Sequence, residues 1–163
     1  MTKIKKIIFV IIILFLCTIK VNSKIEDSLF ITVGNIAITK LDIVNEIKII
    51  LILSNASYTD DKRDMLNTMA IKSVVRRSVK TVEIKRNNFL QYSKKDLNRE
   101  LESLATNLNL DLDTLKNICE SNELDFSLIV DQVKTSLLWN SLIFQIYKDN
   151  LRINAEDIED QLK

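Results

Sequence analysis

The side chains that could do chemistry in this chain are few, and most of them are carboxylates. Asp111 with Asp113, and Asp157 with Glu159, are spaced like acidic pairs that share a proton or an ion. Each pair, however, stands where a helix is predicted to begin. Carboxylates in that position cap the helix and interact favourably with its dipole. We therefore interpret both pairs as helix caps and expect no metal site.

The chain also lacks the residues that most enzyme sites need. It contains no histidine, which removes the commonest general base, the commonest metal ligand and every Ser-His or Cys-His nucleophile. Its single glycine cannot form a glycine-rich phosphate loop. Cys119 follows Ile118 in a predicted helix, where we expect a buried small apolar side chain. The sequence thus predicts neither an enzyme nor a cofactor.

The first 23 residues have the three parts of a secretory signal. Basic residues precede an unbroken apolar run at 7–16, which is short for a membrane span. The residues that follow predict cleavage between Ser23 and Lys24, leaving one exported domain over 24–163. The alternative is an uncleaved membrane anchor formed by the same apolar run.

Charge and cysteine content restrict the partners of the exported part. Removal of the signal takes four of the 23 lysines and arginines and none of the 22 acidic residues, which leaves a net charge of −3. With this slightly negative net charge, we expect no positive electrostatic potential that would attract nucleic acid. Cys119 is then the only cysteine, so no intramolecular disulfide can form.

Turn and cap signals predict one domain of helices that follows a small hairpin. Gly34 and Asn35 separate the runs "LFITV" and "IAIT", which is typical of a two-residue hairpin turn. Thr39 with Asp42 then predicts a capping box. The fold class is mainly α: an orthogonal multi-helix domain of about five to six helices. The predicted helices cover residues 40–54, 60–86, 94–108, 112–120 and 126–150, with another beginning at Asn154.

The positions of the apolar residues predict which helix faces are buried and which residues could bind a peptide. On the 60–86 helix, Ile71, Val75, Val79 and Val82 are expected to form the inward stripe. The run "LLWNSLIFQIY" is apolar on nearly every side, so we expect it to be buried or covered. Candidate peptide-binding residues, with a core position as the alternative for each, are Met65, Met69, Phe89, Phe126 and Trp139.

The order of these elements resembles the N-terminal chaperone domain of the SurA family of periplasmic folding factors. The resemblance covers about residues 25–163 and is most specific at the entry from the hairpin into the helix and near the end of the chain. The matching residues are Val33, Asn35, Ile38, Thr39 and Asp42, then the segment of Leu110, Leu112 and Leu115, and finally Ile153, Glu156, Asp157 and Ile158.

The resemblance implies a periplasmic, ATP-independent holdase of a Gram-negative bacterium that binds unfolded outer-membrane β-barrel precursors. Family members usually continue into parvulin-type prolyl isomerase domains. The sequence shows no such domain, and the lack of histidine agrees with the loss of that chemistry, so we expect no isomerase activity. A membrane-anchored helical scaffold and a residual prolyl isomerase are the alternatives.

The family's C-terminal segment, which completes the hairpin, is also missing from the sequence. We therefore expect the hairpin to present an open edge that a second copy, a partner strand or a client backbone could fill by β-augmentation. The candidate edge residues are Phe30, Thr32, Gly34, Asn35 and Ile38.

Overall fold

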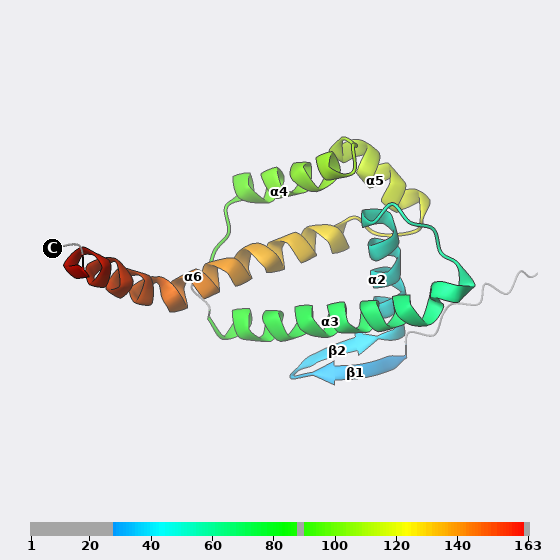
Figure 1. The fold of residues 1–163 in the computed structure, drawn as a ribbon. Coiled ribbons are helices and arrows are strands. Elements are labelled where there is room, and N and C mark those ends of the chain that lie inside the picture. Colours follow the sequence, from blue (N-terminus) through cyan, green and yellow to red (C-terminus); the bar gives the residue numbers. More distant parts are fainter. Residues whose placement is uncertain (1–27, 88–89, 162–163) are drawn as a thin grey trace, which may run out of the picture.

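The computed structural model describes residues 28–87 and 90–161. The predicted cleavage site at Ser23 and Lys24, and the candidate Phe89, lie outside the described residues. Within them, a two-stranded antiparallel hairpin is followed by five α-helices (Figure 1). The predicted fold class is thus confirmed.

The hairpin pairs β1 (Leu29–Val33) with β2 (Ile36–Thr39). Gly34 has a φ of +59°, a conformation that side chains other than glycine rarely adopt. A Cβ atom at this position would also lie 3.2 Å from a methyl carbon of Val82. The only glycine of the chain is therefore required both by the turn and by the close approach of the hairpin to a helix.

Helix α2 (Lys40–Leu53) begins with the predicted capping box. The backbone N–H of Asp42 donates to the Thr39 hydroxyl at 3.2 Å, and the Thr39 N–H donates to the Asp42 carboxylate at 2.7 Å. These reciprocal bonds satisfy backbone donors that the first helical turn leaves unpaired. Because Thr39 also ends β2, the cap fixes the angle between the hairpin and the helix.

The remaining elements follow the predicted order. A short 3₁₀ turn η1 (Asp60–Lys62) leads directly into the long helix α3 (Arg63–Arg86). The predicted caps are present on the next two helices, where Ser93 and Asp111 accept backbone hydrogen bonds. The helices after α3 are α4 (Lys94–Asn107), α5 (Leu112–Ser121) and α6 (Ser127–Gln161).

Three helices end in the left-handed conformation without a glycine. Asn55, Asn109 and Glu123 follow α2, α4 and α5, and each has a φ between +49° and +58°. The N–H groups after each helix bond to carbonyls of its last turn, as in a Schellman motif. Asparagine tolerates this conformation better than most residues, whereas glutamate adopts it at a cost.

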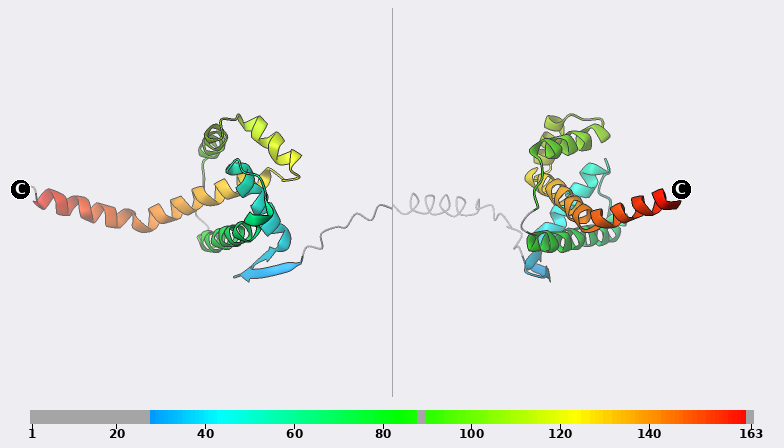
Figure 2. Two further views of the ribbon diagram at one scale, coloured as in Figure 1. Left: turned by 45° about the vertical axis from the view of Figure 1, so that its right-hand side comes forward. Right: turned by 90° about the vertical axis from the view of Figure 1, so that its left-hand side faces the viewer.

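The helices form two apolar clusters that share α2. Ile43 packs with Ile38, Ala70 and Val74 between the hairpin and α3. Ile49, two turns later on α2, belongs to the larger cluster of α4, α5 and the first part of α6. In the views of Figures 1 and 2, α6 accordingly passes between α3 on one side and α4 with α5 on the other.

Two expectations for the long helices were wrong. The inward stripe of α3 is Leu66, Ala70, Val74 and Ser78, whereas Val79 is 46% exposed. The buried row lies one position earlier than predicted: Ala70 and Val74 form the hairpin cluster with Ile38 and Ile43, and Ile71 and Val75 are only partly buried against it. In addition, α6 continues through Asn154 without a break, since no glycine or proline interrupts it.

The C-terminal half of α6 leaves the body of the domain. Leu142 is 4% exposed, yet Phe144, Ile146 and Tyr147 are 63%, 57% and 52% exposed. Figures 1 and 2 show the helix running out beyond the ends of α3 and α4. The described part of the chain therefore covers this apolar run as far as Ile143 and leaves its end exposed.

Candidate polypeptide-binding surfaces

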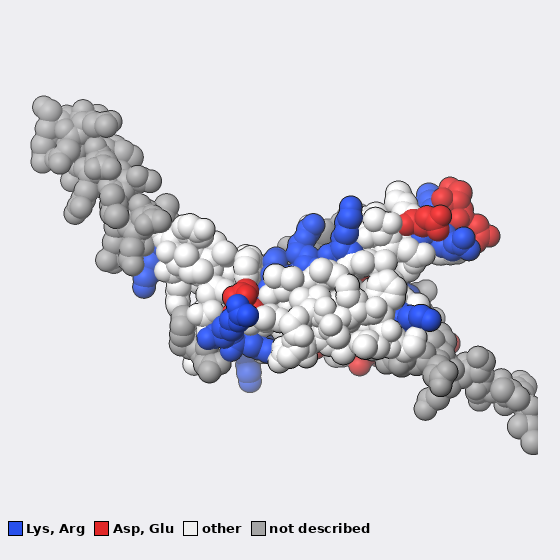
Figure 3. All heavy atoms as spheres, turned by 90° about the horizontal axis from the view of Figure 1, so that it is seen from below, with Lys and Arg blue, Asp and Glu red and all other residues white. Residues whose placement is uncertain are grey.

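The outer strand of the hairpin is exposed and carries no charge. Every β1 residue except Val33 is exposed, including Phe30 at 47% and Ile31 at 42%. No charged residue occurs between Ser28 and Thr39. Seen from the hairpin side, the molecule shows a broad uncharged surface with charged residues of both signs along its borders (Figure 3). Proteins usually protect such an edge with charges, proline or a covering segment.

The candidate edge residues occupy different environments. Phe30 and Thr32 lie on the exposed strand, and Gly34 and Asn35 lie at its exposed turn. Ile38 is only 1% exposed, because its side chain packs in the hairpin cluster. The structure thus places the first four on a surface and makes Ile38 the anchor that holds the hairpin to α2 and α3.

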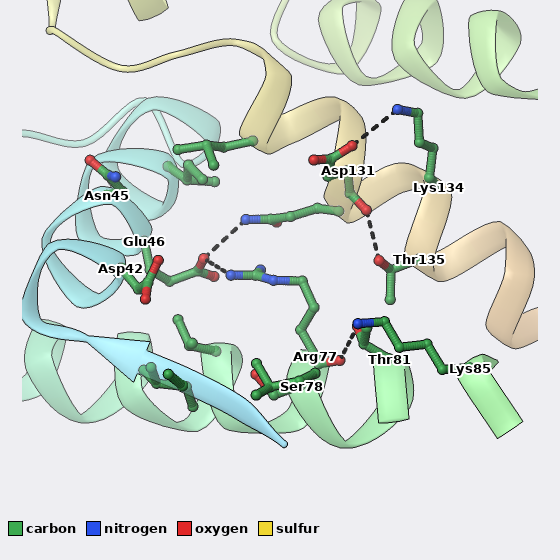
Figure 4. A pocket seen from close by; sticks show the side chains of 17 residues that line it. Asp42, Asn45, Glu46, Arg77, Ser78, Thr81, Lys85, Asp131, Lys134 and Thr135 are labelled. Atoms are coloured by element: carbon green, nitrogen blue, oxygen red, sulfur yellow. Dashed lines mark hydrogen bonds and ion pairs between the residues drawn. The ribbon is translucent and has the colours of Figure 1, made fainter. Parts of the chain in front are cut away.

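A hollow of about 470 Å³ with mixed apolar and polar walls lies behind the hairpin, between β2, α2, α3 and α6 (Figure 4). Glu46, 2% exposed, stands at its floor and links three helices. Its carboxylate accepts hydrogen bonds from Ser73 at 2.5 Å, Arg77 at 2.6 Å and Gln132 at 3.0 Å. Because these partners surround the carboxylate, we assign Glu46 a structural role rather than a catalytic one.

An apolar groove runs between α4 and α6. A hollow of about 300 Å³ is lined by Leu53, Leu104, Val133 and Leu137, with Glu100 as the one charged residue on its wall. A more open hollow of about 810 Å³ shares Leu137 and Asn140 with it but lies between the loop before α4 and α6, reaches Lys148 and has mostly polar walls. We call the first hollow the α4–α6 groove. Apolar walls with few polar groups suit extended apolar segments of other polypeptides.

The sequence candidates do not form one site. Met65 and Met69 are 53% and 46% exposed on the outer side of α3. Phe126 packs against the larger apolar cluster, where it serves the core. These three residues therefore belong to two separate regions of the described structure.

Trp139 lies at the junction of α3 and α6, where the Lys80 ammonium stands 5.5 Å from the centre of its ring. Such a cation–π contact joins the two helices through a half-buried aromatic residue. The tryptophan is therefore a packing residue of the helix interface in this structure.

The side chains that sequence reasoning missed are Glu46 and the apolar residues of the α4–α6 groove. The burial of Glu46 could have been predicted from the sequence, because it lies three residues after Ile43 and three before Ile49 on the inward face of α2. A carboxylate in such a position must find partners on neighbouring helices. The groove had no local signal, because it depends on how α4 and α6 diverge.

Cys119 is fully buried in the larger cluster, as expected. Burial raises the pKa of its thiol, which keeps it in the unreactive protonated form. Among residues 28–87 and 90–161 no group of three or more acidic or cysteine side chains could hold a metal ion. None of the described helices is long and apolar enough to cross a membrane.

Comparison with known proteins adds no assignment. The chain matches no protein-family model, no curated protein and no solved structure. Any proposal about function therefore rests on the sequence pattern together with the exposed strand and the α4–α6 groove.

Proposed function

We propose that this chain is an ATP-independent periplasmic chaperone that holds unfolded outer-membrane β-barrel precursors, as its resemblance to the SurA family implies. The observation that carries the proposal is the uncharged, exposed strand β1. A client in extended conformation can add to this edge through backbone hydrogen bonds, which do not depend on the client's sequence.

The α4–α6 groove supports the proposal by offering a second kind of contact. Strands of outer-membrane barrels alternate apolar with polar residues. The apolar side chains of such a client fit the walls formed by Leu104, Val133 and Leu137. Together, a strand edge for backbone pairing and a separate apolar groove would bind many sequences weakly, which is the behaviour of a holdase.

The decisive experiment is the suppression of aggregation of a urea-unfolded outer-membrane β-barrel protein diluted into buffer with the purified chain. We expect suppression at near-stoichiometric ratios without ATP. Aggregation that proceeds unchanged in the presence of the well-folded chain would overturn the chaperone proposal. A proline-peptide assay on the same sample should show no acceleration over the uncatalysed rate.

A matched pair of variants tests whether β1 is the binding edge. Phe30→Lys places a charge on the exposed strand and should weaken client binding by roughly tenfold, equivalent to about 1.4 kcal/mol. Tyr58→Lys is the control, because Tyr58 is 49% exposed and lies in a loop remote in sequence. Equal client affinity of the two variants would exclude β1 as the edge.

Location is tested by the N-terminal sequence of the protein recovered from the periplasm of an expressing Gram-negative host. A mature chain that begins at Lys24 supports export with cleavage. Recovery of the uncleaved chain in the inner membrane would favour the anchored scaffold instead.

A further inference from the structure

The outer side of α3 carries an exposed stripe at coiled-coil spacing. Met65, Met69, Lys72, Arg76 and Val79 are all exposed and recur at intervals of four, three, four and three residues. These intervals place the five side chains along one seam, to which a second helix can pack. We call these residues the outer α3 stripe.

The stripe is basic as well as apolar. Helix α3 contains seven lysines and arginines and two acidic residues. Lys72 and Arg76 lie inside the stripe, between Met69 and Val79, and none of the ion pairs found among the described residues involves them. A helix that packs on this stripe must therefore be both amphipathic and acidic.

The distal part of α6, residues 149–161, has that composition. It contains five acidic residues and one arginine. Leu151, Ala155 and Ile158 recur in its sequence at intervals of four and three, which is the spacing of the stripe. Thirteen helical residues extend about 18 Å, close to the roughly 21 Å between Met65 and Val79.

The distal part of α6 cannot reach the stripe of its own chain. The helix is continuous from Ser127 to Gln161 and leaves the body beyond the end of α3 that carries Arg86 (Figures 1 and 2). Met65, in contrast, lies in the first turn of α3. A second copy of the chain is therefore the occupant that the geometry allows.

We propose that two copies of this chain form a two-fold dimer in which the distal α6 of each copy packs on the outer α3 stripe of the other. The exchange is reciprocal, so both interfaces are identical and the assembly is closed. Phe144 and Tyr147 precede Leu151 at intervals that continue the same helical face, so the exchange also brings these two exposed side chains next to the second copy. This interface is separate from β1 and does not depend on the proposed function.

The test uses two charge-reversal variants, one for each side of the proposed interface, and analytical ultracentrifugation of the full chain. One variant is Lys72→Glu with Arg76→Glu; the other replaces the four acidic residues Glu156, Asp157, Glu159 and Asp160 with lysine. We expect the unmodified chain to sediment as a dimer. Each variant alone should lose roughly 100-fold or more in dimer affinity, because like charges then face each other.

Mixing the two variants should restore the dimer, since both interfaces of the mixed pair are again complementary. The control is Lys94→Glu with Lys95→Glu, two exposed lysines at the start of α4 that should leave the dimer intact. Circular dichroism confirms that each variant is helical. A monomeric unmodified chain, a dimer that survives either reversal, or a mixture that stays monomeric would overturn the proposal.

Discussion

Glu46 connects three helices through one buried carboxylate, so its removal leaves several polar partners unsatisfied. Its closest charged partner, Arg77, retains 27% exposure of its side chain. We therefore expect Glu46→Ala to lower the free energy of unfolding by about 3 kcal/mol, at the lower end for a broken buried pair. Urea denaturation followed by circular dichroism measures the change.

The double variant Glu46→Met with Arg77→Met is the informative comparison. Replacing both members of a buried pair with apolar residues often restores stability. We expect the double variant to be more stable than Glu46→Ala. A loss below about 1 kcal/mol for Glu46→Ala would contradict the linking role of the carboxylate.

Glu123 adopts a left-handed backbone conformation, with a φ of +53°. This costs a residue with a side chain roughly 1 kcal/mol or more, and glycine avoids that cost. We expect Glu123→Gly to raise the unfolding free energy by about 1 kcal/mol, measured by thermal denaturation. Glu120→Gly, in the last turn of α5, should instead destabilise the protein. Unchanged or reduced stability of Glu123→Gly would count against the strain.

At the scale of the elements, the cap of α5 makes stability depend on pH. A hydrogen bond from the Thr114 N–H, 2.7 Å long, holds the pKa of the Asp111 carboxyl below its usual range. The unfolded chain therefore binds this proton at a higher pH than the folded chain does. The stabilisation by the Asp111 cap is fully present above about pH 4, and it is lost as the pH falls through the pKa of the folded state.

Asp111→Asn tests this dependence, because asparagine can still cap the helix but does not titrate. We expect the variant to lose less stability than the unmodified chain between about pH 4 and pH 2. Asp113→Asn is the control, since the Asp113 side chain accepts from Lys116 and not from the helix backbone. Parallel acid denaturation curves for Asp111→Asn and the unmodified chain would refute the assignment.

The elements that could be predicted from sequence are those defined by local signals. The turn at Gly34 and the caps at Thr39, Ser93 and Asp111 fixed where the hairpin and three helices begin. The buried face of α3 depends on packing against α2 and the hairpin together, so the stripe containing Val79 was assigned wrongly. For the same reason the α4–α6 groove could not be predicted, because it is a product of the assembled helices.

At the scale of the whole molecule, α2 joins two apolar clusters, and its Glu46 links α3 and α6 through hydrogen bonds from Arg77 and Gln132. Ile43 belongs to one cluster and Ile49 to the other, so rupture of either should disturb both. We expect the unmodified chain to unfold in one transition, with the fluorescence of Trp139 and the far-ultraviolet circular dichroism giving the same midpoint in urea.

Loss of the hydrogen bonds that Glu46 accepts should separate the fluorescence midpoint from the circular dichroism midpoint. In Glu46→Ala we expect the Trp139 fluorescence, which reports the α3–α6 contact, to change at lower urea than the helical signal. Leu29→Ala, at the 62% exposed start of β1, is the control and should keep the two midpoints equal. Coincident midpoints in Glu46→Ala would mean that other contacts couple the clusters.

The concealed position of Cys119 has a consequence for the kinetics of the protein. A thiol that is fully buried and held protonated reacts with an alkylating reagent only when α5 moves away from its neighbours. At low reagent concentration the labelling rate is proportional to the fraction of molecules in which the thiol is exposed. At high reagent concentration it equals the rate at which the cluster opens. Labelling of Cys119 therefore measures how often and how fast the apolar cluster beneath α5 opens.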